Sequence, residues 1–359
     1  MPKHEGKAEC KRHGEAEPKR TAGAQTTMKY FITGATGYIG QQLTEQLVAG
    51  GHEVHALYRS EKKTGGLPKE GVHLFKGDLL DPDSLKKAVK GTDAVFHVAA
   101  FAKPWAKDDQ TFYRLNVDGA LNVFHAALEA GVSKIVFTST AGVISPSKDG
   151  VPSDETTPRW VEHFTHYERS KAKAEKEVQK LVSKEGLEII TVNPTRVYGP
   201  GLLSDSNGVT RMVKMYLEGK FRLIPGDGSS IGNYVYIDDV VEGHLKAMEK
   251  GRPGERYILG GDNASFNEFF QLLAQVTGKE QRLFKIPIPV INFAARLMEI
   301  RADLTNKDPL LTPPWVRKYL YNWQLSTEKA ERELGYRPTP LPEGLRKTVE
   351  WLVGVGSRE

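Results

Sequence analysis

Residues 28–40 read MKYFITGATGYIG, a short apolar run followed at once by a turn that contains three glycines. The apolar run predicts a buried strand, and Gly34, Gly37 and Gly40 predict a tight turn into a helix. Small residues let the backbone approach a phosphate group, and a helix N-terminus offers free N–H groups and partial positive charge. A glycine corner that serves only strand-to-helix packing is the alternative that this stretch leaves open.

The alternation of apolar runs and amphipathic stretches continues downstream. Further strand-like runs occur at 52–57, 72–77, 94–100, 134–140 and 187–193. Near-continuous apolar strands that alternate with helices are typical of a parallel sheet covered on both faces. The predicted fold class is therefore α/β, with a doubly wound parallel sheet.

Three regions differ in composition. Residues 1–27 contain almost no large apolar side chains, which predicts a disordered leader. Residues 28–195 contain the regular alternation of the sheet domain. Residues 196–355 have longer loops and more proline, as in GPGLLSDSNG and LIPGDGSSIGN, and predict a smaller substrate-binding α/β region. This region is partly interleaved, because NYVYIDD and ERYILGG within it still predict strands.

Composition excludes several classes of protein. The net charge of +5 is too small for a nucleic-acid interface, which needs clustered basic residues. The single cysteine, Cys10, indicates a reducing compartment, so we expect a cytoplasmic protein. The chain lacks an apolar run of about 18 residues, so no membrane span is expected. No spacing of histidine, cysteine or carboxylate residues suggests a metal site, and the expected partner is a small anionic ligand.

One basic residue bears on the choice of nucleotide. Glycine turns that bind NAD usually have an acidic residue about 20 positions later, which binds the adenosine ribose. Here the second apolar run ends in HALYRSEKK, and Arg59 stands where the acid would be. A guanidinium suits a 2′-phosphate, so NADP is expected, with Lys62 or Lys63 assisting. If Arg59 is only a solvated surface charge, NAD is the alternative.

The stretch HYERSKAKAEKEV places Tyr167 and Lys171 one helical turn apart, on the same face of a helix. A phenol is a poor acid–base group at neutral pH, but a nearby ammonium favours the phenolate. The same spacing occurs at two other tyrosines. Only this pair follows the fifth strand, where a sheet of this class opens its ligand crevice. Hydroxyl groups at Thr138, Ser139 and Thr140 end that strand.

Together, these ordered motifs resemble the extended short-chain dehydrogenase/reductase family, the NAD-dependent epimerase/dehydratase superfamily. The resemblance runs from Met28 nearly to the C-terminus, through TGATGYIG, GDLLD, HVAA, NVDGALNV, VFTSTAG, YERSK, NPTRVYGPG and LSTEKAERELGYRP. VFTSTAG followed by YERSK looks most like the dihydroflavonol reductase and 3β-hydroxysteroid dehydrogenase branch. The resemblance implies a Rossmann fold, an NAD(P)-binding domain at 28–195, and phosphate binding by the glycine turn.

The resemblance also implies a catalytic set. Tyr167 would donate or accept the proton of a substrate oxygen, and Thr140 would orient that oxygen, with Ser139 as the neighbour to test. Lys171 would bind the nicotinamide ribose and lower the pKa of the tyrosine. A homodimer packed through the helices that carry Asn116 and Tyr167 is implied as well.

A cofactor-binding set is implied in the same way. Its members are Gly34, Thr36, Gly37, Tyr38, Ile39, Gly40, Arg59, Asp78, Leu79, Val98, Ala99, Ala100, Asn116, Lys171, Pro194 and Val197. For Asn116, hydrogen bonding inside a helix is an equally good alternative.

One departure from the family pattern concerns the substrate. Sugar-nucleotide epimerases and dehydratases typically carry an arginine, which clamps the substrate diphosphate, just before the strand that here reads NYVYIDD. Gly232 occupies that position, and a glycine cannot neutralise a diphosphate. Arg196, Arg211 and Arg222 are the residues that could substitute for it in space.

The main functional expectation is an NAD(P)-dependent reductase or dehydrogenase that moves hydride between nicotinamide and a carbonyl or secondary alcohol. Aromatic residues in the loop FAKPW (101–105) suit an apolar or ring-shaped substrate, although loop packing is an alternative. A sugar-nucleotide epimerase or dehydratase is the alternative enzyme. A non-catalytic NADP-sensing protein is the third hypothesis, and the intact Thr140, Tyr167 and Lys171 disfavour it.

Three further features are interpreted outside this set. His163 and His166 flank Tyr167 and are expected at the rim of the site, with tuning of the tyrosine as the alternative. One aspartate of the pair in VYIDD (235–239) is expected to cap the following helix. The apolar run at 286–300 predicts a lid over the substrate pocket, and contact with a membrane surface is the alternative.

Overall fold

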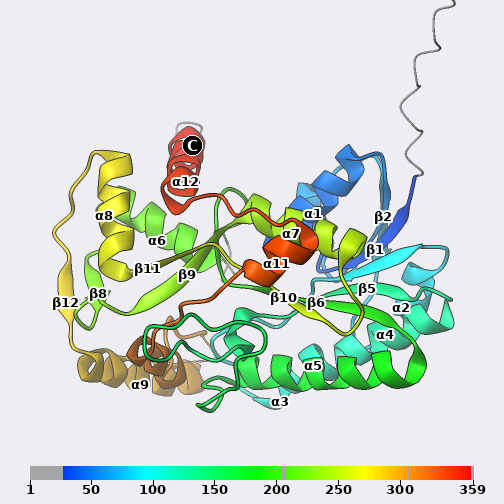
Figure 1. The fold of residues 1–359 in the computed structure, drawn as a ribbon, viewed down its shortest axis with the longest axis horizontal. Helices are drawn as coiled ribbons and strands as arrows, with labels where there is room; N and C mark the ends of the chain where they lie inside the picture. The colour runs from blue at the N-terminus through cyan, green and yellow to red at the C-terminus, as the bar shows by residue number, and fades with distance from the viewer. Residues whose placement is uncertain (1–26, 204–206, 306, 357–359) are drawn as a thin grey trace, which may run out of the picture.

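A seven-stranded parallel sheet forms the centre of the protein (Figure 1). The computed structural model describes residues 27–203, 207–305 and 307–356. The strand order is β10-β6-β5-β4-β1-β2-β3, and every neighbouring pair is parallel. The strands are β1 (Lys29–Thr33), β2 (Glu53–Tyr58), β3 (Val72–Lys76), β4 (Ala94–His97), β5 (Lys134–Thr138), β6 (Glu188–Pro194) and β10 (Arg256–Leu259). The predicted α/β fold class with a doubly wound parallel sheet is confirmed.

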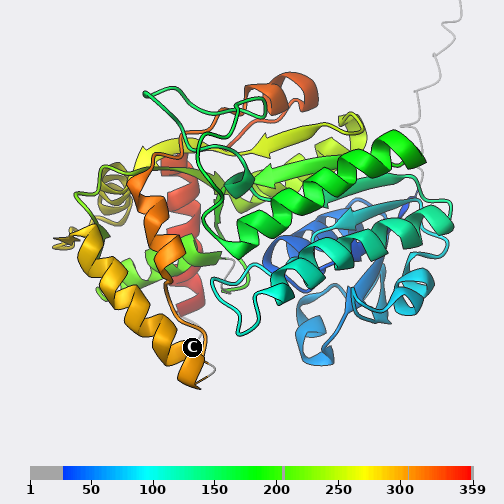
Figure 2. The same cartoon turned by 90° about the horizontal axis from the view of Figure 1, so that it is seen from below.

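Helices cover both faces of this sheet, which explains why its strands are apolar on both sides. Buried side chains of α1 (Tyr38–Ala49) and α7 (Ile237–Lys250) belong to one hydrophobic cluster. Those of α2 (Pro82–Val89), α4 (Gly119–Glu129) and α5 (His166–Glu185) belong to the cluster of the opposite face. Figure 2 shows α4 and α5 running side by side across that face.

A second group of elements lies beyond the C-terminal edge of the large sheet (Figure 1). It contains a three-stranded sheet of β11 (Asp262–Ser265), β9 (Ile231–Tyr236) and β7 (Arg196–Tyr198), and a two-stranded sheet of β12 (Phe284–Ile286) and β8 (Leu223–Pro225). Its helices are α6 (Gly208–Leu217), α8 (Phe266–Thr277), α9 (Ile288–Thr305), α10 (Pro313–Arg317) and α12 (Leu341–Gly356), whereas α11 (Glu328–Leu334) packs against α7 and β10 of the large sheet. Strand β10 of the large sheet comes from this part of the chain. The exact domain boundaries stay a prediction.

The start of α7 differs from the prediction that an aspartate would cap it. The helix begins at Ile237 with Tyr236 as its N-cap, so Asp238 and Asp239 both lie in the first turn. The buried Ile237 continues directly from β9, which moves the helix start ahead of the carboxylates. Asp239 instead accepts hydrogen bonds from the backbone N and Oγ1 of Thr339, at 2.7 and 2.8 Å.

Helix α9 contains most of the apolar run at 286–300. It packs against α10, with Ala295 and Ala302 buried. Its outward face exposes five large apolar side chains: Val290, Phe293, Leu297, Ile300 and Leu304. Within the described ranges, no helix is both long and apolar enough to cross a membrane. A lid function for α9 stays a prediction, and the predicted leader lies, except for Thr27, outside the described residues.

Candidate active site

The three glycines of the turn differ in how much room a side chain would have at each position. Gly34 has φ +77°, and a Cβ there would lie 2.6 Å from the backbone N of Ala99. A Cβ at Gly40 would lie 2.1 Å from the carbonyl oxygen of Gly34, so these two glycines are required by packing. Gly37 is the N-cap of α1, without a side-chain cap, and its Cβ would meet only the Gly34 oxygen, at 3.2 Å. The open helix N-terminus at Gly37 fits a phosphate group.

Arg59 and Asp78, which follow neighbouring strands, form an ion pair. Arg59 Nη1 lies 3.8 Å from Asp78 Oδ2, and both side chains remain substantially exposed. Asp78 Oδ1 also accepts a hydrogen bond from Leu80 N at 2.9 Å. The two residues predicted to meet the adenosine half of the cofactor therefore lie together, at the carboxyl ends of β2 and β3.

The remaining predicted cofactor residues lie at the same edge of the sheet. Gly34 to Gly40 follow β1, Val98 to Ala100 follow β4, and Pro194 and Val197 end β6 and enter β7. The parallel register of β1, β4, β5 and β6 brings these strand ends side by side. This edge is where open α/β sheets bind their ligands.

Tyr167 lies in the first turn of α5, which a capping box starts. Thr165 Oγ1 accepts a hydrogen bond from Glu168 N, and Glu168 Oε2 accepts one from Thr165 N. Thr140 caps a short 3₁₀ turn (Ala141–Val143) after β5, where its Oγ1 accepts a hydrogen bond from Gly142 N at 3.2 Å. Burial raises the pKa of Tyr167 to about 12, and the nearby Thr140 side chain opposes this rise.

Lys171 is fully buried one turn along α5. Its Nζ donates to the carbonyl oxygen of Thr138 at 2.8 Å and lies 4.0 Å from the centre of the Phe137 ring. Burial lowers the pKa of Lys171 to about 7, against an opposing effect of Glu175. The sequence predicted that Lys171 would lower the pKa of Tyr167. In this structure the pKa of Tyr167 is raised instead, because the loss of solvation on burial outweighs the lowering effect of the Thr140 side chain.

Asn116 joins two elements of the site. It lies in a π-helical turn (Arg114–Asp118), a feature frequent at functional sites. Its Oδ1 accepts from Phe101 N at 2.7 Å, and its Nδ2 donates to Phe101 O and to Ser170 Oγ at 3.2 and 2.9 Å. Asn116 therefore ties the loop after β4 to α5, and its side chain does not bond within its own helix.

Asn193 is a site residue that the sequence interpretation missed. Its Nδ2 donates to the carbonyl oxygen of Thr140 at 3.0 Å and to Glu175 Oε1 at 2.8 Å. Its Oδ1 is buried without a hydrogen-bond partner among the described residues, as is Ser139 Oγ. The available signal was its place immediately before Pro194, at the end of a strand that borders β5.

The two histidines beside Tyr167 have different environments. His166 Nε2 lies 3.1 Å from Asp109 Oδ2, and its Nδ1 lies 3.4 Å from the hydroxyl of Tyr113. Burial lowers the pKa of His163 to about 4, and the charge of Arg159 lowers it further. A rim position for both stays a prediction.

Arg196 occupies the place that Gly232 leaves open. A Cβ at Gly232 would lie 2.3 Å from Arg196 Nη1. Of the three arginines considered as substitutes for the arginine of sugar-nucleotide enzymes, Arg196 is therefore the one beside this glycine. The departure at Gly232 does not remove positive charge from this part of the protein.

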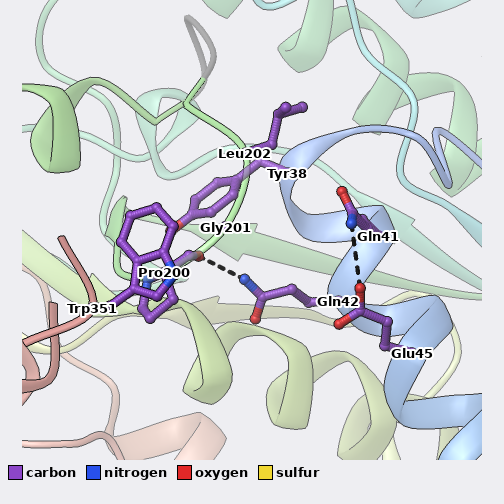
Figure 3. Close-up of a pocket in the computed structure, with 8 residues that line it drawn as sticks. All are labelled: Tyr38, Gln41, Gln42, Glu45, Pro200, Gly201, Leu202 and Trp351. Carbon is purple, nitrogen blue, oxygen red and sulfur yellow. Dashed lines mark hydrogen bonds between the residues drawn. The ribbon is translucent and has the colours of Figure 1, made fainter. Parts of the chain in front are cut away.

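A surface pocket lies behind the glycine turn (Figure 3). It is lined by Tyr38, Gln41, Gln42, Glu45, Pro200, Gly201, Leu202 and Trp351. Gln42 Nε2 donates to Pro200 O at 2.7 Å, and the Tyr38 hydroxyl donates to Gly199 O at 3.0 Å. These contacts attach α1 to the loop after β7, and the reacting side chains lie elsewhere. The described residues contain no cluster of potential metal ligands.

Comparison with known proteins agrees with this geometry. A family model described as the NAD dependent epimerase/dehydratase family matches residues 30–260. A 2-alkyl-3-oxoalkanoate reductase from Stenotrophomonas maltophilia is 33% identical, covering 89% of this chain and 98% of that protein. 3beta-hydroxysteroid-dehydrogenase/decarboxylase isoform 1 from Arabidopsis thaliana is 28% identical, with coverages of 89% and 78%.

A solved structure adds a cofactor to the comparison. UDP-glucose 4-epimerase from Thermus thermophilus, in complex with NAD, is similar with a TM-score of 0.74 and 26% identity, covering 91% of this chain and 99% of that one. The chain therefore belongs to the NAD-dependent epimerase/dehydratase family, the extended short-chain dehydrogenase/reductases, and is an NAD(P)-dependent oxidoreductase.

Proposed function

We propose that the protein is a reductase or dehydrogenase that interconverts a carbonyl group and a secondary alcohol on a small, largely apolar or ring-shaped substrate, with Tyr167 as the proton donor or acceptor. The observation that carries this proposal is the convergence of three side chains at the end of β5: Thr140 lies close enough to the Tyr167 phenol to lower its pKa, and the buried Lys171, one turn along α5, donates to the carbonyl oxygen of Thr138. An apolar substrate is supported by relatives whose names describe a reductase of alkyl oxoalkanoates and a hydroxysteroid dehydrogenase.

The bound nicotinamide would supply or accept the hydride. Thr140 would orient the substrate oxygen against Tyr167, whose hydroxyl would hold the proton that this oxygen gains or loses. With its pKa raised to about 12, the tyrosine stays protonated at neutral pH, which suits the donor role in carbonyl reduction. Lys171 would bind the nicotinamide ribose, and Asn193 would hold the strand end that carries Thr140.

NADP is the proposed cofactor. The glycine turn would bind its diphosphate at the open N-terminus of α1, and Arg59 would bind the 2′-phosphate. The exposed Arg59–Asp78 pair is long, at 3.8 Å, so its guanidinium has donors left for a phosphate. Replacing Arg59 with Ala should weaken NADPH binding more than NADH binding. Equal effects on the two nucleotides would favour NAD.

The alternative is a sugar-nucleotide epimerase or dehydratase. It is favoured by one specific observation, the guanidinium of Arg196 beside Gly232. In either case we propose a cytoplasmic homodimer that packs through α5, which carries Tyr167, and through the π-helical turn that carries Asn116 together with α4, which continues from it. Light scattering on the purified protein tests the dimer.

Identification of the nucleotide that copurifies with the protein distinguishes the two enzymes. The protein is purified without added nucleotide and denatured, and any released nicotinamide nucleotide is quantified. A reductase exchanges its cofactor at each turnover, so we expect little bound nucleotide and tighter binding of NADPH than of NADH. Near-stoichiometric NAD would contradict the proposal and indicate an epimerase that regenerates its cofactor in place.

A further inference from the structure

Arg196, on β7, reaches toward Gly232 on the neighbouring strand β9. The parallel pairing of β7 with β9 places Arg196 opposite Tyr234. Gly232 precedes Tyr234 by two residues, so both face the same side of β9. The guanidinium carbon of Arg196 lies 2.4 Å from where a Gly232 side chain would begin. The guanidinium therefore occupies space that exists only because residue 232 is glycine.

The surroundings of this guanidinium hold it in place without neutralising it. Nη1 of Arg196 donates to the Tyr234 hydroxyl at 3.2 Å, and the rings of Tyr234 and Phe266 lie 5.4 and 5.7 Å from Cζ. The side chain is partly buried, and no carboxylate of the described residues lies within ion-pairing distance of it. A charge removed from water without a counter-charge is unfavourable, so an arginine in this setting suits an anionic ligand.

One connection between Arg196 and the reacting side chains runs along the chain. Asn193 donates to the carbonyl oxygen of Thr140 at 3.0 Å. Arg196 follows Asn193 by three residues, a distance of about 10 Å at most along extended backbone. The strand end that carries Thr140 and the start of β7 therefore lie at the same edge of the sheet.

A second connection runs through the 3₁₀ turn at Lys318–Leu320. Lys318 Nζ lies 2.6 Å from Oε1 of Glu168, the residue after Tyr167. The next residue, Tyr319, is close enough to Arg196 for that charge to oppose the rise in the tyrosine's pKa that burial causes. Arg196 and the start of α5 are therefore both neighbours of the Lys318–Leu320 turn.

We propose that Arg196 is the recognition residue for an oxyanion of the substrate, a carboxylate or a phosphate carried beside the carbonyl or alcohol that reacts at Tyr167. The inference rests on the proposed function, because it assigns a substrate class to the same site. The planar fork of the guanidinium matches the two oxygens of either group. Gly232 contributes by leaving room for it.

The test compares an acid with its neutral ester. 3-Hydroxydecanoate and methyl 3-hydroxydecanoate are assayed as hydride donors with NADP⁺ and NAD⁺, and kcat/KM is measured for each. We expect the wild type to prefer the acid. Replacing Arg196 with Met should lower the acid-to-ester ratio about 10- to 100-fold, because the charge-assisted hydrogen bonds to the carboxylate are lost. Arg222→Met, the same change at an exposed arginine of this region, should leave the ratio unchanged.

A second variant tests the role of Gly232 without removing the arginine. The backbone of Gly232 is not in the left-handed region, and a methyl group there would meet the flexible end of a side chain, so Gly232→Ala should fold. It should displace the guanidinium and lower the acid-to-ester ratio in the same direction as Arg196→Met. An unchanged ratio in both variants would overturn the proposal.

Binding measurements separate this inference from the proposed function. Calorimetric titration with 3-hydroxydecanoate, and separately with UDP, does not require turnover. If Arg196→Met lowers the affinity for either ligand, the oxyanion site is supported. The ligand whose affinity falls shows whether the site binds a carboxylate or a diphosphate. Failure of both probes to bind the wild type would overturn the site. Failure of both substrates to be oxidised, with Arg196-dependent binding intact, would contradict only the proposed reductase.

Discussion

Two residues of the glycine turn, Gly40 and Gly37, are expected to serve different purposes, the first in packing and the second in ligand binding. A methyl group at Gly40 would lie 2.1 Å from the backbone oxygen of Gly34 and collide with it, whereas one at Gly37 would lie 3.2 Å from that oxygen, a tight contact that a small shift relieves. We therefore expect Gly40→Ala to lower the free energy of unfolding by about 1–3 kcal/mol. Gly37→Ala should unfold with a free energy close to that of the wild type. It should weaken NADPH binding at least about 10-fold, because the methyl group stands where the phosphate would approach.

Urea unfolding and fluorescence titration with NADPH check this pair of variants. Normal affinity in Gly37→Ala would mean that the turn serves packing alone.

Lys171 illustrates a functional residue that costs stability. Burial lowers its pKa to about 7, from 10.5 in the unfolded chain. Between these values the native protein binds fewer protons than the unfolded chain, so the contribution of Lys171 to stability rises with pH. Relative to Lys171→Met, the free energy of unfolding of the wild type should rise by up to about 1.4 kcal/mol per pH unit. We expect this rise between pH 7 and pH 9.5, because that range lies between the pKa of about 7 in the folded protein and the value of 10.5 in the unfolded chain. A difference in unfolding free energy that stays constant with pH would contradict this account.

At the scale of elements, the start of α5 sets the position of Tyr167. The chain offers a matched pair of capping boxes, Thr165 with Glu168 on α5 and Ser265 with Glu268 on α8. Replacing either Thr165 or Ser265 with Ala should lower the free energy of unfolding by about 1 kcal/mol. Only Thr165→Ala should also lower kcat, because it loosens the turn that carries Tyr167. Similar kcat losses in both variants would indicate a general effect of stability.

The elements of the large sheet were predictable from sequence, because buried parallel strands are apolar runs bounded by glycine and polar residues. The start of α7 was not, since the carboxylates at Asp238 and Asp239 suggested a cap while the buried Ile237 already begins the helix. Tyr167, Lys171 and Thr140 were found through motif order and spacing. The role of Asn193 and the approach of Arg196 to Gly232 depend on contacts between strands far apart in sequence, which no local pattern encodes.

At the scale of the whole molecule, buried histidines make the fold sensitive to acid. His97 and His244 are fully buried, and burial lowers their pKa values to about 3 and about 4. The unfolded chain, with histidine pKa values near 6.5, binds more protons below that pH, so stability is full above it and falls as the pH decreases. We expect the free energy of unfolding to decline between about pH 6.5 and 4.5, before most carboxylates titrate.

His244→Gln should make that decline shallower, as measured by urea unfolding across this range. A wild-type stability that stays flat from neutral pH down to the titration of the carboxylates would show that these histidines are not buried in the neutral form.

The most direct measurement of the central claim is the turnover of Tyr167→Phe. The variant is assayed for NADPH-dependent reduction of the carbonyl substrate that the wild type uses best, and its NADPH dissociation constant is measured beside it. Loss of the phenolic hydroxyl should lower kcat about 10³-fold, with NADPH affinity within about twofold of wild type. Near-normal turnover with intact cofactor binding would contradict the assignment of Tyr167 as the proton-transferring residue.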